Sequence, residues 1–263
     1  MSYKDIPKSH VLVKDREKAL LISQYPKINN DLTFTFSDEI KDDKEVMKNA
    51  VYNNGKCIMD CSDRLKNDYE IAMLSVGNNP HMLRYVGEDM KNNKDVVIIA
   101  ISQQGSVLDY ASDDLKNNRD IVITAMNQND NALNYAGDKI KNDKDFILKC
   151  VKQNGDLLEY ASPELQNDKQ VVLEAVSNRG DVLYSASDEL KNNPEVVLIA
   201  IENETSAAEW MSDDLKKDKD FIKQAIKIDK SSVVYADKSI RDEVIDEISP
   251  KEQTNSKEIE LER

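Results

Sequence analysis

The sequence predicts an all-α fold: an α-solenoid of about eight 25-residue helix-turn-helix repeats with degenerate terminal caps. Three observations predict it. An apolar residue recurs every 25 positions, apolar residues within each period follow helical spacing, and helix start signals recur in register. We call the recurring apolar position the anchor; it comprises Ile40, Leu65, Met90, Leu115, Ile140, Leu165, Leu190, Leu215 and Ile240. Because one such unit is too small to bury a core alone, neighbouring units must stack.

The longer predicted helix of each repeat starts three residues after the anchor, at an Asp or Asn. These side chains cap free N–H groups at a helix start, and they are Asp68, Asn93, Asn118, Asp143, Asp168, Asn193 and Asp218. Acidic residues such as Asp120 follow in the first turn, where the helix dipole favours them. Ile121, Val122 and Ala125 then continue at helical spacing. The pattern predicts a helix of about ten residues.

Each long helix is expected to end at a glycine in the left-handed C-cap conformation. The glycines at this position are Gly55, Gly105, Gly155 and Gly180. A second, shorter helix follows, as over 106–111 and 156–161, and a serine-led turn rich in acids returns to the next anchor. No segment alternates with period two for long, so strands are not expected.

The tenth position after the anchor carries small residues in eight successive repeats: Ala50, Ser75, Ala100, Ala125, Cys150, Ala175, Ala200 and Ala225. Such a row indicates close approach between helices, where a larger side chain would clash. We therefore expect the substitution Ala125→Leu to destabilise the fold by roughly 1–3 kcal/mol.

The regular pattern divides the chain into three parts. Residues 1–31 form an N-terminal helical cap with one amphipathic helix over 15–24, out of register with the repeats. Residues 32–248 form the repeat domain, which opens on a degenerate second helix at 32–37. The remainder, 249–263, is a charged tail without apolar periodicity and is predicted to be disordered.

Composition limits the function classes. A chain of 263 residues that is 40% hydrophobic can bury a core, and no apolar window is long enough to span a membrane. The polar N-terminus lacks a signal peptide and the three cysteines are sparse, which predicts a cytoplasmic location. The formal net charge of −14 argues against direct binding of nucleic acid or of an anionic membrane. It favours a partner with a basic surface.

Residues 140–162 combine Lys-Asn-Asp-Lys-Asp, an apolar patch, Gln-Asn-Gly and Leu-Leu-Glu-Tyr-Ala-Ser. This run resembles the repeat family called domain of unknown function 4116, whose units of about fifty residues equal two periods here. The resemblance covers residues 40–236 and implies no established activity. Because the family also occurs in bacteria that live inside host cells, delivery into a host cell is the alternative to the cytoplasm. The glycine is missing at Pro80, Asp130, Thr205 and Lys230, and Ser185 and Trp210 replace the usual tyrosine.

An aromatic residue recurs near the end of the shorter helix and is the candidate partner-binding stripe. We call this set the aromatic register; it comprises Tyr85, Tyr110, Tyr135, Tyr160, Trp210 and Tyr235. Exposed rings in one row could anchor a partner. Recurrence in nearly every repeat instead favours a structural role, as half-buried rings that stack between layers. The sequence does not decide whether the rings are exposed.

Nothing in the sequence indicates catalysis, a cofactor or a metal, and none is predicted. Cys57 and Cys61 lie four residues apart, but His10 and His81 are the chain's two histidines, and a zinc site needs four ligands. These thiols are therefore interpreted as buried apolar residues. No phosphate-binding loop or nucleophile motif is present.

The leading hypothesis is a non-catalytic helical-repeat scaffold that mediates protein–protein interaction, because solenoids present long binding surfaces. Three alternatives stay open. The acidic surface could mimic nucleic acid and occupy a nucleic-acid-binding protein. An enzyme could hide an unrecognised site where the repeat breaks, at 78–85 or 205–210. The chain could also have a purely structural role through self-association, since the sequence does not fix its oligomeric state.

Overall fold

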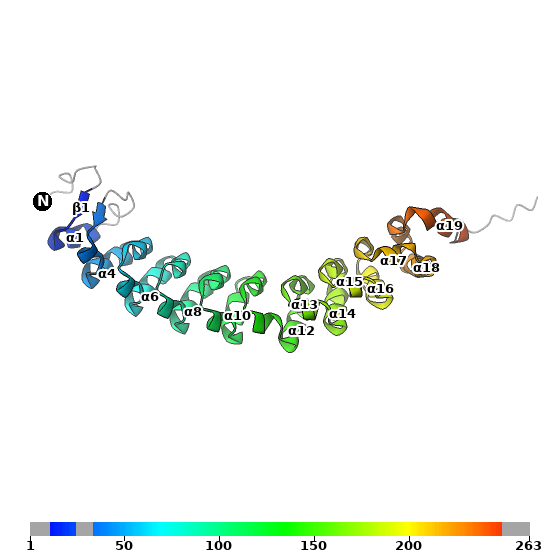
Figure 1. The fold of residues 1–263 in the computed structure, drawn as a ribbon, viewed down its shortest axis with the longest axis horizontal. Coiled ribbons are helices and arrows are strands. Elements are labelled where there is room, and N and C mark those ends of the chain that lie inside the picture. Colours follow the sequence, from blue (N-terminus) through cyan, green and yellow to red (C-terminus); the bar gives the residue numbers. More distant parts are fainter. Residues whose placement is uncertain (1–10, 25–33, 249–263) are drawn as a thin grey trace, which may run out of the picture. The chain divides into compact units, whose positions relative to one another are not determined.

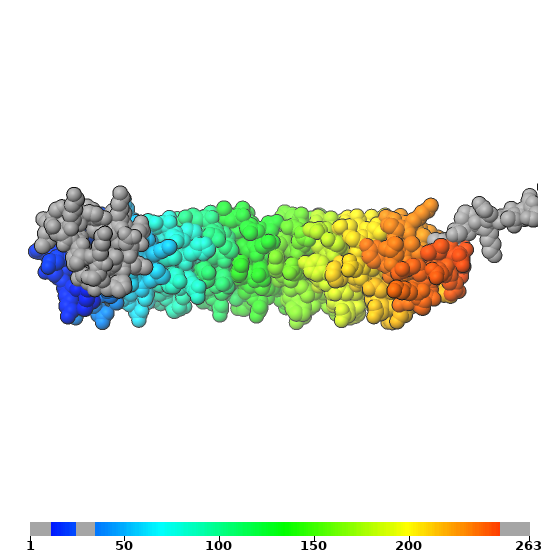
Figure 2. All heavy atoms as spheres, turned by 90° about the horizontal axis from the view of Figure 1, so that it is seen from above, coloured from blue at the N-terminus to red at the C-terminus, as the bar shows by residue number. Residues whose placement is uncertain are grey.

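The computed structural model describes residues 11–24 and 34–248, and its elements are labelled in Figure 1. They belong to two compact units: unit 1 ends at Lys141 and unit 2 begins at Asn142. Each unit is a stack of helical repeats, which confirms the predicted all-α solenoid. In the space-filling view, successive repeats of each unit follow one another as bands of colour (Figure 2).

The long helix of each repeat begins and ends close to its predicted bounds. In unit 1 these helices are α4 (Lys44–Asn53), α6 (Tyr69–Asn78), α8 (Lys94–Gln103) and α10 (Arg119–Met126). In unit 2 they are α12 (Lys144–Gln153), α14 (Lys169–Asn178), α16 (Pro194–Asn203) and α18 (Lys219–Ile228). The predicted caps are confirmed: the Asp68 carboxylate accepts from the Glu70 and Ile71 N–H groups at 3.1 and 3.2 Å.

The shorter helix of each repeat is a 3-10 helix rather than an α-helix. These helices are η2 (Gly55–Asp60), η3 (Pro80–Arg84), η4 (Gly105–Tyr110), η5 (Asp130–Tyr135), η6 (Gly155–Tyr160), η7 (Gly180–Ser185), η8 (Thr205–Trp210) and η9 (Lys230–Tyr235). A 3-10 helix has three residues per turn, so residues three apart share a face. Gly105, Leu108 and Ala111 follow that spacing, and all three are buried.

The serine-led turn is also helical, as a four- or five-residue α-helix before each long helix. These helices are α3 (Asp38–Lys41), α5 (Asp63–Lys66), α7 (Glu88–Lys91), α9 (Asp113–Lys116), α11 (Asp138–Lys141), α13 (Pro163–Gln166), α15 (Asp188–Lys191) and α17 (Asp213–Lys217). The Ser112 hydroxyl caps α9 by accepting from the Leu115 N–H at 3.3 Å. Each repeat therefore has three helical segments rather than two.

The predicted role of the glycines is wrong. No glycine in the described residues has a left-handed φ, and the long helices other than α10 instead end at an extended residue such as Asn54. Gly55, Gly105, Gly155 and Gly180 open the 3-10 helices, where the next repeat comes very close. A Cβ at Gly155 would lie 2.7 Å from the Ala175 carbonyl oxygen. Glycine is required for this approach between layers rather than for φ.

The small tenth position is confirmed as a point of contact between layers. All eight of its residues are buried, and Ala125 is fully inaccessible to solvent. The one serine, Ser75, donates its hydroxyl to the Gly55 carbonyl of the preceding repeat at 2.9 Å. A larger side chain here would have to displace the backbone of a neighbouring 3-10 helix.

A ladder of hydrogen bonds also joins successive short α-helices. The Ser112 N–H donates to the Lys91 carbonyl at 3.0 Å, and the Ser112 hydroxyl donates to Asn92 Oδ1 at 2.6 Å. Where glycine replaces the serine, at Gly87, a Cβ would overlap the Asn67 side chain. The Asn67 Oδ1 atom there accepts directly from the Asp89 N–H at 3.2 Å, so an asparagine side chain replaces the missing cap.

The N-terminal part of unit 1 contains both a confirmed helix and an unexpected sheet. Helix α1 (Arg16–Ser23) has the predicted bounds, with Asp15 as its cap. The strands β1 (Val11–Val13) and β2 (Phe34–Phe36) pair in parallel, so the expectation of a helix over 32–37 and of no strands is wrong. Residues 32 and 33 lie outside the described residues.

At the C-terminal end of unit 2, α19 (Lys238–Ile248) packs on α18. The predicted tail, 249–263, and most of the predicted cap, 1–31, lie outside the described residues, so that division stays a prediction. Within the described part of the chain, no helix is both long enough and apolar enough to cross a bilayer.

Candidate protein-interaction surface

Each repeat presents two exposed surfaces. The first, which we call the helix face, is the solvent side of the long helices. The second, the 3-10 face, is the solvent side of the 3-10 helices and carries the aromatic register at their ends. Because every repeat contributes the same positions, side chains of one kind line up across a unit.

The aromatic register is partly exposed in both units. Tyr85 is 38% exposed and Trp210 is 41% exposed, whereas the other four rings are half-buried. Tyr85, Tyr110 and Tyr135 belong to unit 1, and Tyr160, Trp210 and Tyr235 belong to unit 2. The rings are thus neither fully buried stacking residues nor fully exposed ones. Their role in binding stays a prediction.

In unit 1 a cationic side chain already occupies the aromatic register. The Arg84 guanidinium carbon lies 5.8 Å from the centre of the Tyr85 ring and 5.9 Å from that of Tyr110. Both distances are within the range of a cation–π interaction. The arginine therefore bridges rings of two successive repeats on the 3-10 face.

In unit 2 the equivalent position carries carboxylates and a cluster of rings. The Tyr184 and Trp210 ring centres are 5.8 Å apart and the rings are tilted by 55°, a favourable aromatic geometry. The Tyr184 hydroxyl donates to Glu159 Oε2 at 3.0 Å. Partial burial, together with the neighbouring Glu159 carboxylate, raises the pKa of Tyr184 above its usual 10.0. The hydroxyl thus stays protonated and keeps donating at neutral pH.

An ion-pair cluster borders these rings. Arg179 contacts Asp181 with two nitrogens, at 2.7 and 2.9 Å, and Asp156 of the preceding repeat at 2.8 Å. The two carboxylates raise the pKa of Arg179 further above its already high value. This part of the 3-10 face is fixed by pairs between repeats.

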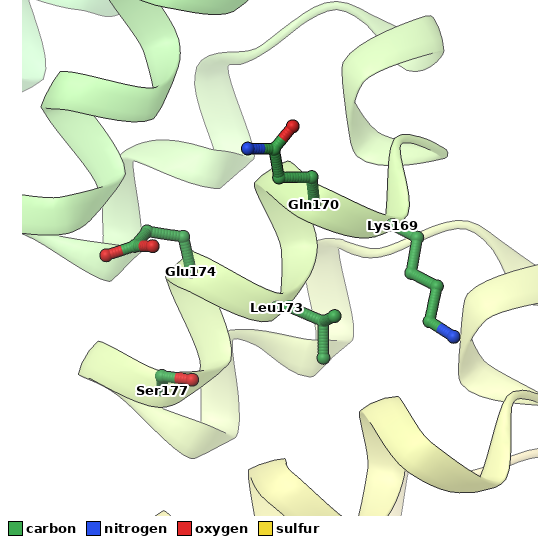
Figure 3. A pocket seen from close by; sticks show the side chains of 5 residues that line it. All are labelled: Lys169, Gln170, Leu173, Glu174 and Ser177. Atoms are coloured by element: carbon green, nitrogen blue, oxygen red, sulfur yellow. The ribbon is translucent and has the colours of Figure 1, made fainter.

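The helix face of unit 2 contains an open groove of about 440 Å³ along α14 (Figure 3). Its lining comes from one side of that helix: Lys169, Gln170, Leu173, Glu174 and Ser177. Lys169 extends to the next repeat, where its Nζ lies 2.6 Å from Glu195 Oε2. The groove does not include either repeat break, 78–85 or 205–210, that the sequence marks as a candidate enzyme site.

Ion pairs between repeats neutralise many acids of the helix face. Lys44 contacts Asp68 at 2.8 Å, and Lys144 contacts Asp168 at 2.7 Å in the same register. These contacts join the first turns of successive long helices. Two of the acids that cap long helices, Asp68 and Asp168, are therefore matched by lysines of the preceding repeat, which reduces the negative charge of the helix face.

Cys57 and Cys61 lie at least partly buried in unit 1. Cys61 is buried and Cys57 is half-buried, and burial raises the pKa of Cys61 to about 12 and that of Cys57 to about 11. Both thiols are protonated at neutral pH and are weak nucleophiles. Across residues 11–24 and 34–248, no three His, Cys, Asp or Glu side chains come together as metal ligands.

Thr205, which stands where other repeats have glycine, anchors a low-pKa carboxylate. Asp229 accepts from the Thr205 hydroxyl at 2.6 Å, and from the Ser231 hydroxyl and N–H at 2.7 and 2.8 Å. These hydrogen bonds lower the pKa of Asp229 from 3.8 to about 2. The departure from the repeat pattern thus adds a contact between η8 and the cap of η9.

We expect Thr205→Val to flatten the pH dependence of stability at acid pH. The folded carboxylate has the lower pKa, so its contribution is complete above about pH 4 and disappears as pH falls through about 2. Unfolding midpoints of the wild type and the variant, measured across that interval, should converge at low pH. Two parallel curves would contradict the assignment.

A family model described as Domain of unknown function (DUF4116) matches the chain eight times, at residues 15–66, 43–91, 68–116, 93–141, 118–166, 143–191, 168–215 and 193–241. The chain belongs to this family. From residue 43 onward, each DUF4116 match begins one period after the last and spans about two periods, which confirms the resemblance. The first match includes α1. Searches of curated proteins and of solved structures found no match.

Sequence reasoning about this DUF4116 chain missed one contributor to the 3-10 face, Arg84. Arg84 immediately precedes Tyr85. Two later repeats have an acid at the equivalent position, Glu159 and Glu209. Tyr184 is displaced from the register by one residue, yet its ring meets Trp210. Comparing the position before the aromatic register across repeats would have singled out Arg84.

Proposed function

We propose that this DUF4116 chain is a non-catalytic scaffold that binds a protein partner with a basic surface through its 3-10 face. The observation that carries the proposal is Arg84, which lies over the Tyr85 and Tyr110 rings. Arg84 is a cationic side chain that lies over two rings of the aromatic register. Unit 2 presents rings of the same register but has no arginine at the equivalent position. A partner's arginine or lysine would find comparable rings there.

The rings of unit 2 are better suited to an external cation than those of unit 1. Glu159 and Glu209 take the place of Arg84, so the positions next to Tyr160 and Trp210 carry negative charge. A cation over an aromatic ring contributes about 0.5–2 kcal/mol, and nearby carboxylates strengthen the attraction. Tyr184, Trp210 and Glu159 therefore form the proposed centre of binding.

The alternative of nucleic-acid mimicry has less support. A mimic needs carboxylates spaced along a surface like phosphates, but the pairs Lys44–Asp68 and Lys144–Asp168 neutralise this pattern on the helix face. A surface that combines aromatic rings with carboxylates suits a basic peptide segment of a partner better than it suits the phosphate-binding groove of a nucleic-acid-binding protein. We place the scaffold in the cytoplasm, consistent with three free cysteines.

Trp210 is the only tryptophan of the chain, so its fluorescence reports on the proposed centre without a label. We expect an arginine-rich peptide to change this emission and to bind more weakly as salt rises. The same peptide with glutamine in place of arginine should not bind. Glu159→Gln combined with Tyr184→Ala should weaken the arginine peptide about tenfold.

The matched control is Leu173→Ala, which alters the groove on α14 and should leave the affinity unchanged. Equal binding of the arginine and glutamine peptides would overturn the proposal, as would equal affinity of the double variant and the wild type. Crosslinks from a captured partner to η7 and η8, rather than to the long helices, would support the 3-10 face.

A further inference from the structure

The helix face of unit 1 contains an area without charge. The last six positions of α6, α8 and α10 (residues 73–78, 98–103 and 123–128, the last including the residues just after α10) contain no charged residue, although the chain is 33% charged. In every other long helix the corresponding six positions include at least one charge. These three helices are consecutive and in contact, and they lie side by side in Figure 1. We call this area the neutral patch.

The neutral patch is apolar and exposed at its centre. Ile98 and Ile99 of α8 are each 37% exposed, and Ile123 of α10 is 44% exposed. Met73 and Leu74 of α6 are half-buried in the same register. These side chains form a contiguous apolar row across three helices, which is a candidate site of association.

A glycine in the neutral patch has no explanation within the chain. The other six glycines each lie so close to a neighbouring repeat that a Cβ would meet it, but a Cβ at Gly77 would meet nothing within 4 Å. Glycine within a helix is less stable than alanine, so an unneeded one indicates another constraint. Gly77 follows Met73 by one turn on the same face of α6. An object outside the chain that approaches this point closely would supply the constraint.

We infer that the neutral patch binds the same patch of a second copy of this chain. At a net charge of −14, two copies repel each other wherever their surfaces carry charge, and least where they carry none. The patch is also centred on one helix. A two-fold axis through α8 would set Ile98 and Ile99 against their equivalents and α6 across α10. Ile123 of each copy would then lie opposite Met73 of the other, one turn from Gly77.

The size of the patch predicts a weak, reversible dimer. Six residues of a helix span about 9 Å and packed helices lie about 9 Å apart, so the three helix segments offer about 250 Å² on each copy. Burying the patch on both copies covers about 500 Å², below the standard size of specific interfaces, so we expect a dissociation constant on the order of tens of micromolar. This association uses the helix face and is independent of the 3-10 face proposed to bind the partner.

Sedimentation of the full chain between about 1 and 200 µM tests the dimer, since this range brackets micromolar affinity. The wild type should change from monomer to dimer. Ile98→Glu with Ile99→Glu should raise the dissociation constant at least about tenfold. The matched control, Leu198→Glu with Ile199→Glu, adds the same charge at the same positions of α16 in unit 2 and should leave dimerisation unchanged.

Gly77→Ala separates association from stability, because the two effects have opposite signs. Without a clash inside the chain, alanine should raise the unfolding temperature of the dilute monomer, while its added methyl should weaken the dimer. A chain that stays monomeric throughout overturns the inference, even if it captures another protein through α8. So does a dimer that is weakened equally by both double variants, or one that Gly77→Ala leaves unchanged.

Discussion

Replacing Gly180 by alanine is expected to lower the free energy of unfolding by about 2 kcal/mol, the range of an overpacked interior. The added Cβ would overlap the Ala200 carbonyl oxygen and would lie 2.9 Å from both Cβ and N of Glu204. These are mainly backbone atoms, so a rotamer change does not relieve the contact. The Gly180 N–H also donates to Asn203 Oδ1 at 2.8 Å, a bond that holds the same two repeats together.

Equilibrium denaturation followed by circular dichroism measures this loss, and Gly77→Ala is its control. Both substitutions add the same methyl group and reduce the same freedom of the unfolded chain. Only Gly180→Ala places this methyl group against another repeat. A Gly180→Ala variant as stable as Gly77→Ala would show that the layers can separate slightly at no cost.

The repeat architecture could be predicted because its signals are local and recur. The caps Asp68 and Asn118 follow the anchors at a fixed spacing, and the long helices begin where those side chains accept hydrogen bonds. Each repeat supplies an independent copy of the signal, so chance matches are averaged out. The long helices and the small tenth position could be predicted for that reason.

The misassigned elements depend on contacts that one repeat does not contain. Gly155 has the sequence context of a helix C-cap, but its requirement comes from the Ala175 carbonyl, twenty residues away. In a 3-10 helix, residues on one face recur every third position rather than every third or fourth. In the repeat of η4 this spacing covers only Gly105, Leu108 and Ala111, so the sequence does not distinguish it from a short α-helix. Strand β2 is three residues long and exists because β1 lies beside it.

The candidate surface could be predicted only in part. The aromatic register can be identified from the sequence, but the exposed fraction of each ring depends on how the neighbouring repeat packs against it. Tyr85 and Tyr110 share a register and differ in exposure. The contribution of Arg84 and the shifted ring of Tyr184 depend on distances between repeats. The neutral patch becomes meaningful only once α6, α8 and α10 are known to be adjacent.

Ala125→Leu is expected to destabilise unit 1 by about 1–3 kcal/mol. Ala125 is fully buried in α10, and its carbonyl oxygen lies in the space that a Cβ at Gly105 would need. Helix α10 therefore already contacts η4 as closely as backbone atoms allow. A leucine at this point must push the two repeats apart, which also breaks neighbouring contacts between α8 and α10.

Ala125→Ser distinguishes overpacking from a general intolerance of substitution. Serine already occupies this register at Ser75, where its hydroxyl donates to the Gly55 carbonyl at 2.9 Å. A serine at position 125 can donate to the Gly105 carbonyl in the same way, so we expect its cost to be under about 1 kcal/mol. Thermal melts should therefore rank the wild type and Ala125→Ser together and well above Ala125→Leu. If Ala125→Leu and Ala125→Ser melt at the same temperature, the repeats of unit 1 are not held at backbone contact. The requirement for glycine at position 105 then loses its explanation too.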